Sequence, residues 1–410
     1  MTDTTESIES FRARARAWLA DNMPRLDTDA ARLSGDDPAH WDRARELQQK
    51  LHAGGFAGIC FPEEYGGLGL PHPYQQAFSE EAEGYEMPIV LNIPSFSICC
   101  ATLLDVGSED QKREHIGAAI RGEEVLCQFL SEPSGGSDLA GLITRAERDG
   151  ENWVINGAKI WSTFAYGADY GLCLARTDPE KPKHDGLTMF LMPTRAPGLT
   201  MNRIRMSDGT DEFCEEFFDN VVLGPEHVVG RVNDGWTVAS RQLYHERTAV
   251  GGGSIHTSGY GQPPTRPRPD IIDMIRRTGR AADPDVRRTV GEAIVMSTVH
   301  EQLVERVSAG IEGGHLPPTA ASVPRLFHAE ESEAHTDALV RAAGASAAVA
   351  SEGNAFQDVG LHYLCRQAGS LGGGSSEMAR NLISERLLGM PREQAADRGM
   401  PFNQIKRGSR

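Results

Sequence analysis

The pattern of hydrophobic and polar residues changes twice along this chain of 410 residues. Over residues 1–120, apolar side chains recur at helical spacing. They are Ile8, Phe11, Ala15, Trp18 and Leu19, and then Trp41, Ala44, Leu47 and Leu51. A polar break at 34–38 contains proline and separates the two groups, and a segment rich in Gly and Pro at 62–71 predicts a loop. We therefore expect the first 120 residues to be helical.

Residues 123–225 have the pattern of a β-rich segment. Short apolar runs separated by turn residues replace the helical period, and no long helical pattern interrupts them. Asp149-Gly150 and Asn156-Gly157 are dipeptides of the type that closes β-hairpins. The expected strands are 125–130, 153–155, 170–174, 187–192 and 217–223. This part of the chain is expected to form a small barrel or sandwich.

The helical period returns from Gly235 to the end of the chain. The expected helical stretches are 236–250, 285–312, 318–350 and 376–389, with a linker rich in Gly and Pro at 251–270. The fold class is therefore α+β and mostly α. The expected domains are an N-terminal helical domain (1–122), a middle β-domain (123–232) and a C-terminal helical bundle (233–410).

Charge and cysteine content narrow the classes of function. Lys and Arg total 41 against 58 Asp and Glu, and the net charge of −17 opposes binding to nucleic acid or anionic lipid. We find no run of about 18 apolar residues and no signal peptide, so we expect no membrane span and a cytoplasmic location. Seven cysteines without zinc-ligand spacing predict neither a disulfide framework nor a metal site.

Glu246 is the first candidate for chemistry. Ala239, Leu243, Glu246 and Val250 form an i, i+4, i+7, i+11 stripe, which places Glu246 on the core-facing side of its helix. Desolvation there raises the pKa of a carboxyl group and makes it a general base suited to near-neutral pH. The alternative is a structural ion pair with Arg247 or another arginine.

Three other segments combine glycines with hydroxyl groups or an aromatic ring. In 371–378 a triple glycine opens a helix, as either a phosphate-binding loop or a flexible turn. In 130–141, Ser131 and Ser137 either hydrogen-bond a polar ligand or cap a turn. Trp161 offers a flat face that either stacks on a planar ring or packs in the core. Because GxGxxG and Walker motifs are absent from the sequence, Rossmann and P-loop chemistry lack support.

Taken in order, these segments resemble the acyl-CoA dehydrogenases over nearly the whole chain. The most specific motifs are Phe61-Pro-Glu-Glu-Tyr-Gly-Gly67, Gly107-Ser-Glu-Asp-Gln-Lys112, Leu130-Ser-Glu-Pro133, Gly157-Ala-Lys-Ile-Trp-Ser-Thr163, Phe217-Phe-Asp-Asn-Val221, Gly235-Trp236 and Gly373-Gly-Ser-Ser-Glu377. The segment 283–287 is similar to actinobacterial-type members, some of which act on steroid side chains. The family fold has an N-terminal helical domain, a middle β-domain and a C-terminal four-helix bundle.

The resemblance implies an FAD-dependent oxidation of an acyl-CoA thioester to the 2-enoyl-CoA, in fatty-acid or steroid side-chain catabolism. In this family a carboxylate removes the α-proton while the β-hydrogen leaves as hydride to flavin N5. The implied electron acceptor is an electron-transfer flavoprotein. The implied assembly is a homodimer, a homotetramer or a mixed oligomer with a related chain.

Nine positions match the flavin-contacting positions of the family. They are Gln128, Phe129, Leu130 and Ser131 at the ring edge, Trp161 and Thr163 at the ring-packing and N5-side positions, and Ser375, Ser376 and Glu377 in the turn before the last helix. The resemblance therefore implies that segments far apart in the sequence share one FAD site.

Two further positions are implied to contact the substrate, and one to perform the chemistry. Ser137 matches a position near the pantetheine or phosphate of CoA, and Arg247 is a candidate for the CoA phosphates, which need a local cation on an acidic protein. Many family members carry the base at the position of Gly373, which has no side chain. The isovaleryl and long-chain branch places it in a Glu-Arg pair on the first bundle helix, so the resemblance implies Glu246 as the catalytic base.

Two family segments are not recognisable in this sequence. One is Arg-x-x-Phe-Gly near 260–300, which supports the FAD of the neighbouring subunit, and the other is Gln-x-x-Gly-Gly-x-Gly near 340–360. Two alternatives to a dehydrogenase are a flavin oxidase or monooxygenase on the same fold and a non-catalytic partner subunit of a mixed oligomer. Gly251 to Gly253 either leave room for a bulky or branched acyl group or form a solvent-exposed loop.

Overall fold

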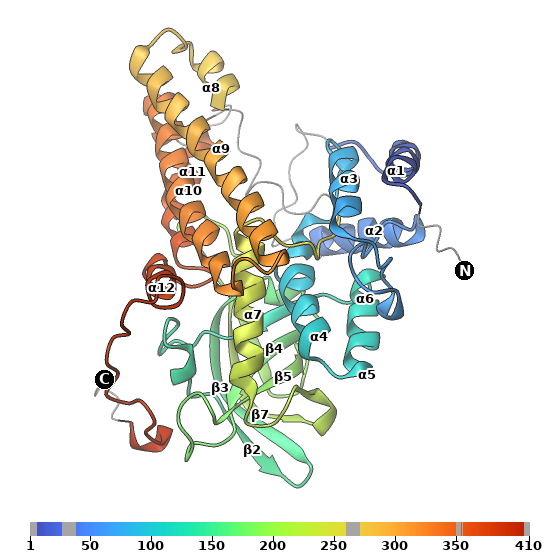
Figure 1. The fold of residues 1–410 in the computed structure, drawn as a ribbon, viewed down its shortest axis with the longest axis vertical. Coiled ribbons are helices and arrows are strands. Elements are labelled where there is room, and N and C mark those ends of the chain that lie inside the picture. Colours follow the sequence, from blue (N-terminus) through green and yellow to red (C-terminus); the bar gives the residue numbers. More distant parts are fainter. Residues whose placement is uncertain (1–5, 27–37, 260–270, 350–353, 355, 406–410) are drawn as a thin grey trace.

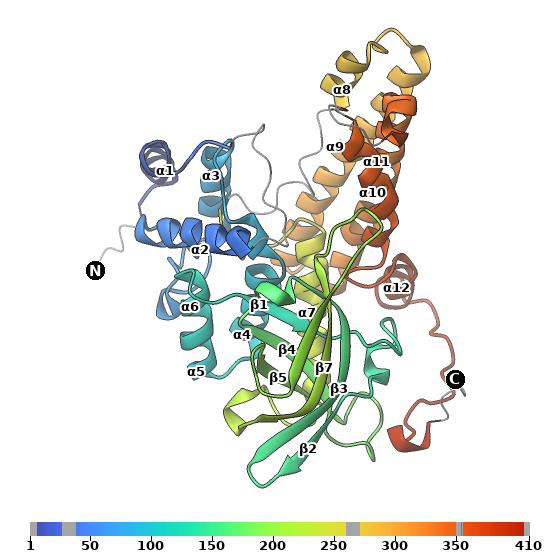
Figure 2. The same ribbon diagram turned by 180° about the vertical axis from the view of Figure 1, so that it is seen from behind.

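Helices, strands and then helices follow one another along the chain, as expected from the sequence (Figures 1 and 2). The computed structural model describes residues 6–26, 38–259, 271–349, 354 and 356–405. The N-terminal helices lie beside a twisted sheet, and the C-terminal helices extend away from the sheet as a long arm (Figure 1). The expected α+β class is confirmed.

The N-terminal part is a cluster of short helices around an aromatic and aliphatic core. Ser7 caps the first turn of its first helix, which buries Phe11, Ala15 and Leu19, the stripe that the spacing predicts. Most of the polar break at 34–38 lies outside the described residues. The principal elements are α1 (Ile8–Asn22), α2 (Pro38–Ala53), α3 (His72–Ala82), the π-helical segment η3 (Asn92–Cys100), α4 (Ala101–Val106), α5 (Glu109–Gln111) and α6 (Gly117–Ile120).

One apolar stretch, Ile89–Val106, has the length and composition of a membrane-crossing helix, with a mean hydropathy of 1.8. This stretch differs from the expectation that the sequence has no run of about 18 apolar residues. In the structure 67% of it is buried, and it packs against α7 (Gly235–Val250) and β1 (Leu126–Phe129). Cys99 and Cys100 within it are buried free thiols. A helix buried in a protein core can be as long and as apolar as a membrane-crossing helix, and the burial of this stretch is that of a core helix.

The middle part is an eight-stranded sheet with the order β6-β7-β3-β2-β4-β5-β8, in which β1 also pairs with β4. β4 runs parallel to β1 and β2, and the other neighbouring strands are antiparallel. The sheet is strongly bent, as Figure 2 shows. The other strands are β2 (Arg145–Asp149), β3 (Asn152–Thr163), β4 (Tyr170–Arg176), β5 (Leu187–Pro193), β6 (Leu199–Ile204), β7 (Phe213–Leu223) and β8 (Val228–Val229).

One of the two expected hairpin turns is wrong. Gly150, with φ +62°, does close the β2–β3 hairpin. Asn156-Gly157 instead lies inside β3, where the register against β7 shifts between Ile155 and Gly157. A Cβ on Gly157 would lie 2.5 Å from Oγ1 of Thr144, so this glycine permits a bulge and a close approach of the backbone. The same residue types suit a turn and a bulge, which explains the error.

The C-terminal part consists of the helix α7 on the sheet and an arm in which α9 and α10 pack side by side. The expected helix at 285–312 is α9 (Pro284–Glu312), which Asp283 caps. The arm has its own small apolar core, separate from the main core. Residues 260–270 of the expected linker lie outside the described residues. The remaining helices are α8 (Ile271–Thr278), α10 (Ser322–Ala343), α11 (Gln357–Cys365) and α12 (Ser376–Leu382).

Candidate active site

The carboxylate of Glu246 meets the turn that precedes α12. Its Oε1 accepts a hydrogen bond of 3.0 Å from the backbone N–H of Gly373. Burial raises the pKa of the Glu246 carboxyl, while the side chain of Gln128, the charge of Arg247 and the Gly373 amide oppose that rise only in part. The site therefore holds a desolvated carboxyl group whose pKa lies above its ordinary value.

The position of Glu246 follows from how α7 lies on the sheet. A Cβ on Gly235, the first residue of the helix, would lie 2.6 Å from Cα of Thr188 in β5, so only glycine allows this close approach. Ala239 is fully buried on the core-facing stripe that the sequence predicts, whereas Glu246 itself is half-buried. α7 also packs against η3, where the negative charge of Glu246 contributes to the raised pKa of the buried Cys99 thiol.

A fully buried arginine holds the turn that Glu246 contacts. The guanidinium of Arg325, on α10, donates to the carbonyl oxygens of Gly369, Gly372 and Gly374, at 3.0 Å for Nε to Gly372 and for Nη2 to Gly374. Burial lowers the pKa of Arg325, and the Glu246 charge opposes this. Sequence reasoning missed this residue; the only signal for it is an arginine within the otherwise apolar opening of a helix.

The turn itself has a defined conformation. Gly373 and Gly374 have φ values of +71° and +87°, in the left-handed region that favours glycine. Ser375 caps α12, since its hydroxyl accepts a hydrogen bond from a backbone N–H in the first turn. Ser376 is buried and Glu377 is exposed, and backbone hydrogen bonding at the helix start lowers the pKa of Glu377. The turn before α12 is therefore well defined, and it places the backbone N–H of Gly373 beside Glu246.

Trp161 stands out on β3. This bulky side chain is 51% exposed and its backbone has φ +66°, a conformation that costs energy for any residue other than glycine. A register shift between Ile160 and Ser162 places it at a bulge, and its ring packs edge-on against Phe213. Thr163, the last residue of the strand, is half-buried. An exposed aromatic face held in a strained conformation is typical of a binding surface.

The strand β1 places its four predicted residues in different surroundings. Phe129 and Leu130 are buried in the main core, so their side chains pack and only their backbone can meet a ligand. Gln128 is half-buried; its side chain lies near the Glu246 carboxyl and lowers the pKa of that group, although its buried Nε2 makes no hydrogen bond of normal geometry. Ser131 is half-buried, two residues after the strand ends at Phe129. The unpaired amide of Gln128 is a donor that a bound molecule could satisfy.

Buried charges fix the strands behind this surface. Lys159 on β3 donates to the carboxylate of Glu132 at 3.1 Å and to the carbonyl of Leu130 at 2.8 Å, and both charged side chains are almost fully buried. On the neighbouring β7, Glu216 accepts a hydrogen bond of 2.8 Å from the hydroxyl of Ser162. Burial raises the pKa of Glu216 to about 8. The ion pair between Lys159 and Glu132 links strand β3, close to Trp161, to the segment that follows β1.

Ser137 lies in an exposed loop that the C-terminal tail helps to hold. Lys183 bridges Asp138 of this loop, at 3.0 Å, and Asp397 of the tail, at 2.9 Å. Arg247 is half-buried, with an Nε that has no hydrogen-bond partner, and burial lowers its pKa. No ion pair within 4.0 Å joins Glu246 to Arg247 or Arg325 among the described residues, so the structure does not support the ion-pair alternative with these arginines.

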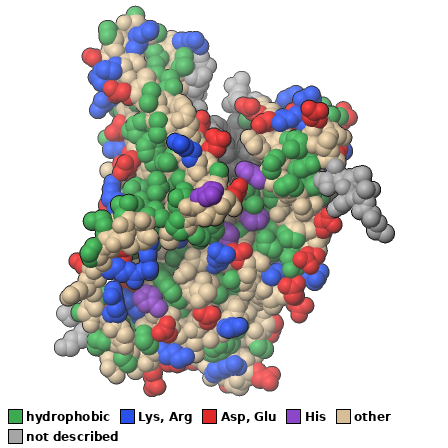
Figure 3. All heavy atoms as spheres, viewed as in Figure 1, with side chains coloured by type: hydrophobic (Ala, Val, Ile, Leu, Met, Phe, Trp, Pro, Cys, Tyr) green, Lys and Arg blue, Asp and Glu red, His purple; other side chains and the backbone are tan. Residues whose placement is uncertain are grey.

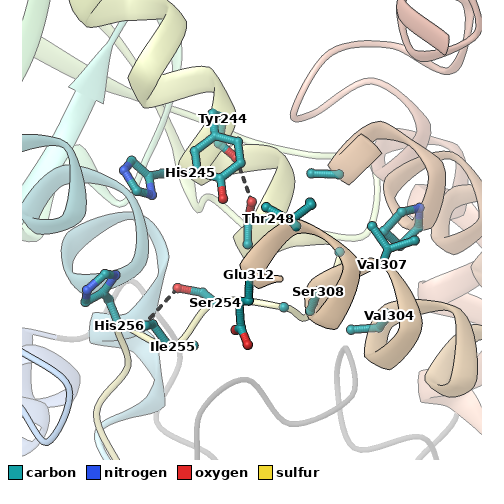
Figure 4. Close-up of a pocket in the computed structure, with 15 residues that line it drawn as sticks. Tyr244, His245, Thr248, Ser254, Ile255, His256, Val304, Val307, Ser308 and Glu312 are labelled. Carbon is teal, nitrogen blue, oxygen red and sulfur yellow. Dashed lines mark hydrogen bonds between the residues drawn. The ribbon is translucent and has the colours of Figure 1, made fainter. Parts of the chain in front are cut away.

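A pocket that is partly open to solvent lies between α7, the segment that follows it and α9 (Figure 4). Gly251 and Gly253 line it, so these glycines border a hollow; that the hollow receives a bulky acyl group stays a prediction. His245 bonds to Asp105 at 2.8 Å through Nε2, and burial lowers the pKa of His256 to about 4. The remaining lining residues are Tyr244, Thr248, Ser254, Ile255, Val304, Val307, Ser308, Ile311, Glu312, Ala321 and Pro324.

Comparison with known proteins identifies the family. Family models of the acyl-CoA dehydrogenase N-terminal, middle and C-terminal domains match residues 5–123, 127–221 and 233–388. Acyl-CoA dehydrogenase IpdE1 of Mycobacterium tuberculosis is 33% identical over 391 residues, which cover 95% of this chain and 99% of that protein.

Solved structures give the same result. The Tcur3481-Tcur3483 steroid ACAD superimposes with a TM-score of 0.78 and 28% identity, over 96% of this chain and 100% of that one. The ChsE4-ChsE5 complex from Mycobacterium tuberculosis shares the fold, with a TM-score of 0.71 and 24% identity over 96% of this chain and 100% of that one. The expected resemblance is confirmed: this chain belongs to the acyl-CoA dehydrogenase family, in its actinobacterial type, and is an oxidoreductase that acts on acyl-CoA.

Proposed function

We propose that this chain oxidises an acyl-CoA thioester between Cα and Cβ and that Glu246 is the base that removes the α-proton. The observation that carries the proposal is the desolvated carboxyl group of Glu246, held by the N–H of Gly373. The α-proton of a thioester is only weakly acidic, so a base with a raised pKa is suited to it near neutral pH. Because Oε1 is held by Gly373, we assign proton uptake to Oε2.

The family is flavin-dependent, and the residues beside Glu246 fit a flat, hydrogen-bonding ring. Trp161 offers an exposed aromatic face and Gln128 an unpaired buried donor. We propose that FAD is held by Gln128, the backbone of Phe129 and Leu130, the side chains of Ser131, Trp161 and Thr163, and the turn at Ser375, Ser376 and Glu377. When bound, FAD would supply the acceptor for the β-hydrogen as hydride.

We propose that the substrate carries a bulky, ring-containing acyl group. The pocket beside α7 offers an apolar wall for such a group, formed by Val304, Val307 and Ile311. The similarity to a steroid ACAD points the same way. For the CoA end we propose Ser137 and Arg247, the latter because CoA phosphates need a cation on this acidic surface.

We further propose a cytoplasmic enzyme that works in an oligomer and passes electrons to an electron-transfer flavoprotein. Two of the similar structures bear names of two chains, Tcur3481-Tcur3483 and the ChsE4-ChsE5 complex, which favours a mixed oligomer with a related chain. Hydrophobic side chains form a strip along one face of the arm (Figure 3), and Ile294, Val295 and Val299 of α9 are exposed. Such a strip is typical of a surface that another chain covers.

The substitution Glu246→Gln tests the proposal, since glutamine has nearly the same shape but cannot accept the proton. We expect substrate-driven bleaching of the flavin and exchange of the substrate α-proton to fall by roughly 10²-fold or more. Glu226→Gln, at an exposed surface glutamate, is the matched control and should bleach normally. Normal bleaching in Glu246→Gln would refute the assignment of the base.

The same experiments separate the alternatives. A flavin spectrum recorded on the chain purified alone, and again with a related partner chain, shows whether this chain binds FAD by itself. A chain that never acquires flavin absorbance would be a non-catalytic partner subunit. Peroxide formed in air without an added acceptor would favour a flavin oxidase on the same fold.

A further inference from the structure

A second cluster of reactive side chains lies in the arm, on the seam between α9 and α10. His300 comes from α9, and His328 and Glu331 come from α10, with one ligand atom of each within 4.8 Å of the others. The rings of His300 and His328 stand 5.0 Å apart, centroid to centroid. His328 and Glu331 are three residues apart on one helix and therefore share a face. These three residues have no role in the proposed dehydrogenation.

The chemistry of the cluster is that of a divalent metal site. Two imidazoles and one carboxylate are a ligand set that zinc and other first-row divalent metals use, with an open position for water or a fourth ligand. Donor atoms on a tetrahedral zinc ion stand roughly 3.3–3.5 Å apart, as follows from zinc–ligand distances near 2.1 Å. The ligand atoms of the three residues lie within 4.8 Å of one another, so a bound ion would draw them closer by rotation of the side chains.

Burial and charge point in the same direction. Glu331 is fully buried and His328 is only 6% exposed. A carboxylate removed from water is costly unless a cation or hydrogen bonds compensate for it. Ser297 donates a hydrogen bond of 2.7 Å to Oε1 of Glu331, and such contacts orient ligating carboxylates in metal sites. His300 is half-buried at the edge of the cluster and gives an ion access from solvent.

We propose that His300, His328 and Glu331 bind one Zn²⁺ ion, which joins α9 to α10. No metal site was expected from the sequence, because these ligands have no close spacing along the chain and are brought together only by the packing of two helices. Arg325, which holds the turn next to Glu246, lies one helical turn before His328 on α10. The ion therefore stabilises the segment of α10 that supports the candidate active site, without contacting the reacting atoms.

Zinc binding by the full-length chain tests this proposal directly. After dialysis against a chelator, the protein is titrated with Zn²⁺ alone and the bound metal is counted by elemental analysis after gel filtration. We expect one tightly bound Zn²⁺ per chain and a higher melting temperature with zinc than without it. Ser297→Ala should weaken the affinity by roughly 10–100-fold, as loss of a carboxylate-orienting contact does in metal sites.

Removal of a ligand gives the decisive comparison. His300→Gln, at the half-buried position, should lose the bound ion and the zinc-dependent rise in melting temperature, and His328→Gln should do the same. His315→Gln, at an exposed histidine just after α9, is the matched control and should keep both. Binding that persists unchanged in both ligand variants, or a wild-type chain that retains no zinc, would overturn the proposal.

Discussion

The backbone N–H of Gly373 donates a hydrogen bond of 3.0 Å to Oε1 of Glu246, which links two residues far apart in the chain. The position of Gly373 is the one at which, by resemblance, many acyl-CoA dehydrogenases carry the catalytic base, and Glu246 is the position used by another branch. In this structure the two positions are direct neighbours. On the proposed assignment of the base, a carboxylate on either element would therefore lie near one reaction centre.

The conformation of Gly373 leads to a first prediction. Its φ of +71° is left-handed, and an added Cβ would lie 3.1 Å from Nε of Arg325. We expect Gly373→Ala to lower the free energy of unfolding by about 1–2 kcal/mol and to reduce the rate of flavin bleaching. Gly372→Ala is the matched control, since nothing lies within 4 Å of its Cβ position. Equal stability and activity of the two variants, measured by urea unfolding and stopped flow, would contradict this role of Gly373.

Arg325 gives a second prediction. Its guanidinium serves three carbonyl groups at once, a geometry that the single ammonium of lysine cannot reproduce. Arg325→Lys keeps the positive charge near Glu246 but leaves carbonyl groups unpaired, so we expect a loss of about 3 kcal/mol in the free energy of unfolding. The control Arg288→Lys, at a 60% exposed side chain of α9, should change stability by less than about 0.5 kcal/mol. If Arg325→Lys lowered the free energy of unfolding by no more than this control, the positive charge alone would be enough to hold the turn.

Periodicity and motif order were sufficient to predict the fold, and periodicity predicted on which side of its helix Glu246 lies; its role as the base stays a prediction. The stripe through Ala239 and Glu246 placed the carboxyl group on the inner side of a helix, because amphipathic helices bury one face. The hairpin at Gly150 was also found, since that dipeptide has few other uses in an alternating pattern. Where a residue type serves two structures, as Gly157 does in a bulge, the local sequence could not decide between them.

The residues that sequence reasoning missed act through contacts made only in three dimensions. Arg325 looks like a polar residue in a helix until the turn at 369–374 is brought onto it. His300 and Glu331 lie on separate helices, and neither has the close spacing by which metal ligands are recognised. The matched positions Phe129 and Leu130 were assigned by resemblance, which does not distinguish a side-chain contact from a backbone contact.

The pocket beside α7 leads to a third prediction. Ser308 lines it from α9, and a phenylalanine there would fill part of its volume. We expect Ser308→Phe to lower kcat/KM for a ring-containing acyl-CoA roughly tenfold or more and to leave butyryl-CoA nearly unaffected. Ala20→Phe adds a ring at an exposed position of α1, away from the pocket, and should change neither value. Equal losses for both substrates in Ser308→Phe would mean that the pocket does not receive the acyl group.

A fourth prediction concerns pH and the buried carboxyl group of Glu216. Burial raises its pKa to about 8, from the ordinary value of 4.5. Between these two values the native protein keeps a proton that the unfolded chain has released, so the free energy of unfolding falls as pH rises. The slope from this one group approaches about 1.4 kcal/mol per pH unit within that window and vanishes above pH 8, where both states are ionised.

Glu216→Gln removes this titration while keeping a group that can accept the hydrogen bond from Ser162. We therefore expect the difference in unfolding free energy between the variant and the wild type to grow from pH 5 to pH 8, in favour of the variant. Urea unfolding at half-unit steps of pH measures it. Glu147→Gln, at an exposed glutamate of β2, is the matched control and should follow the wild-type pH dependence. If Glu216→Gln followed it too, the carboxyl group would be ionised in the native protein, and the pairing of Lys159 would have to extend beyond Glu132 to Glu216.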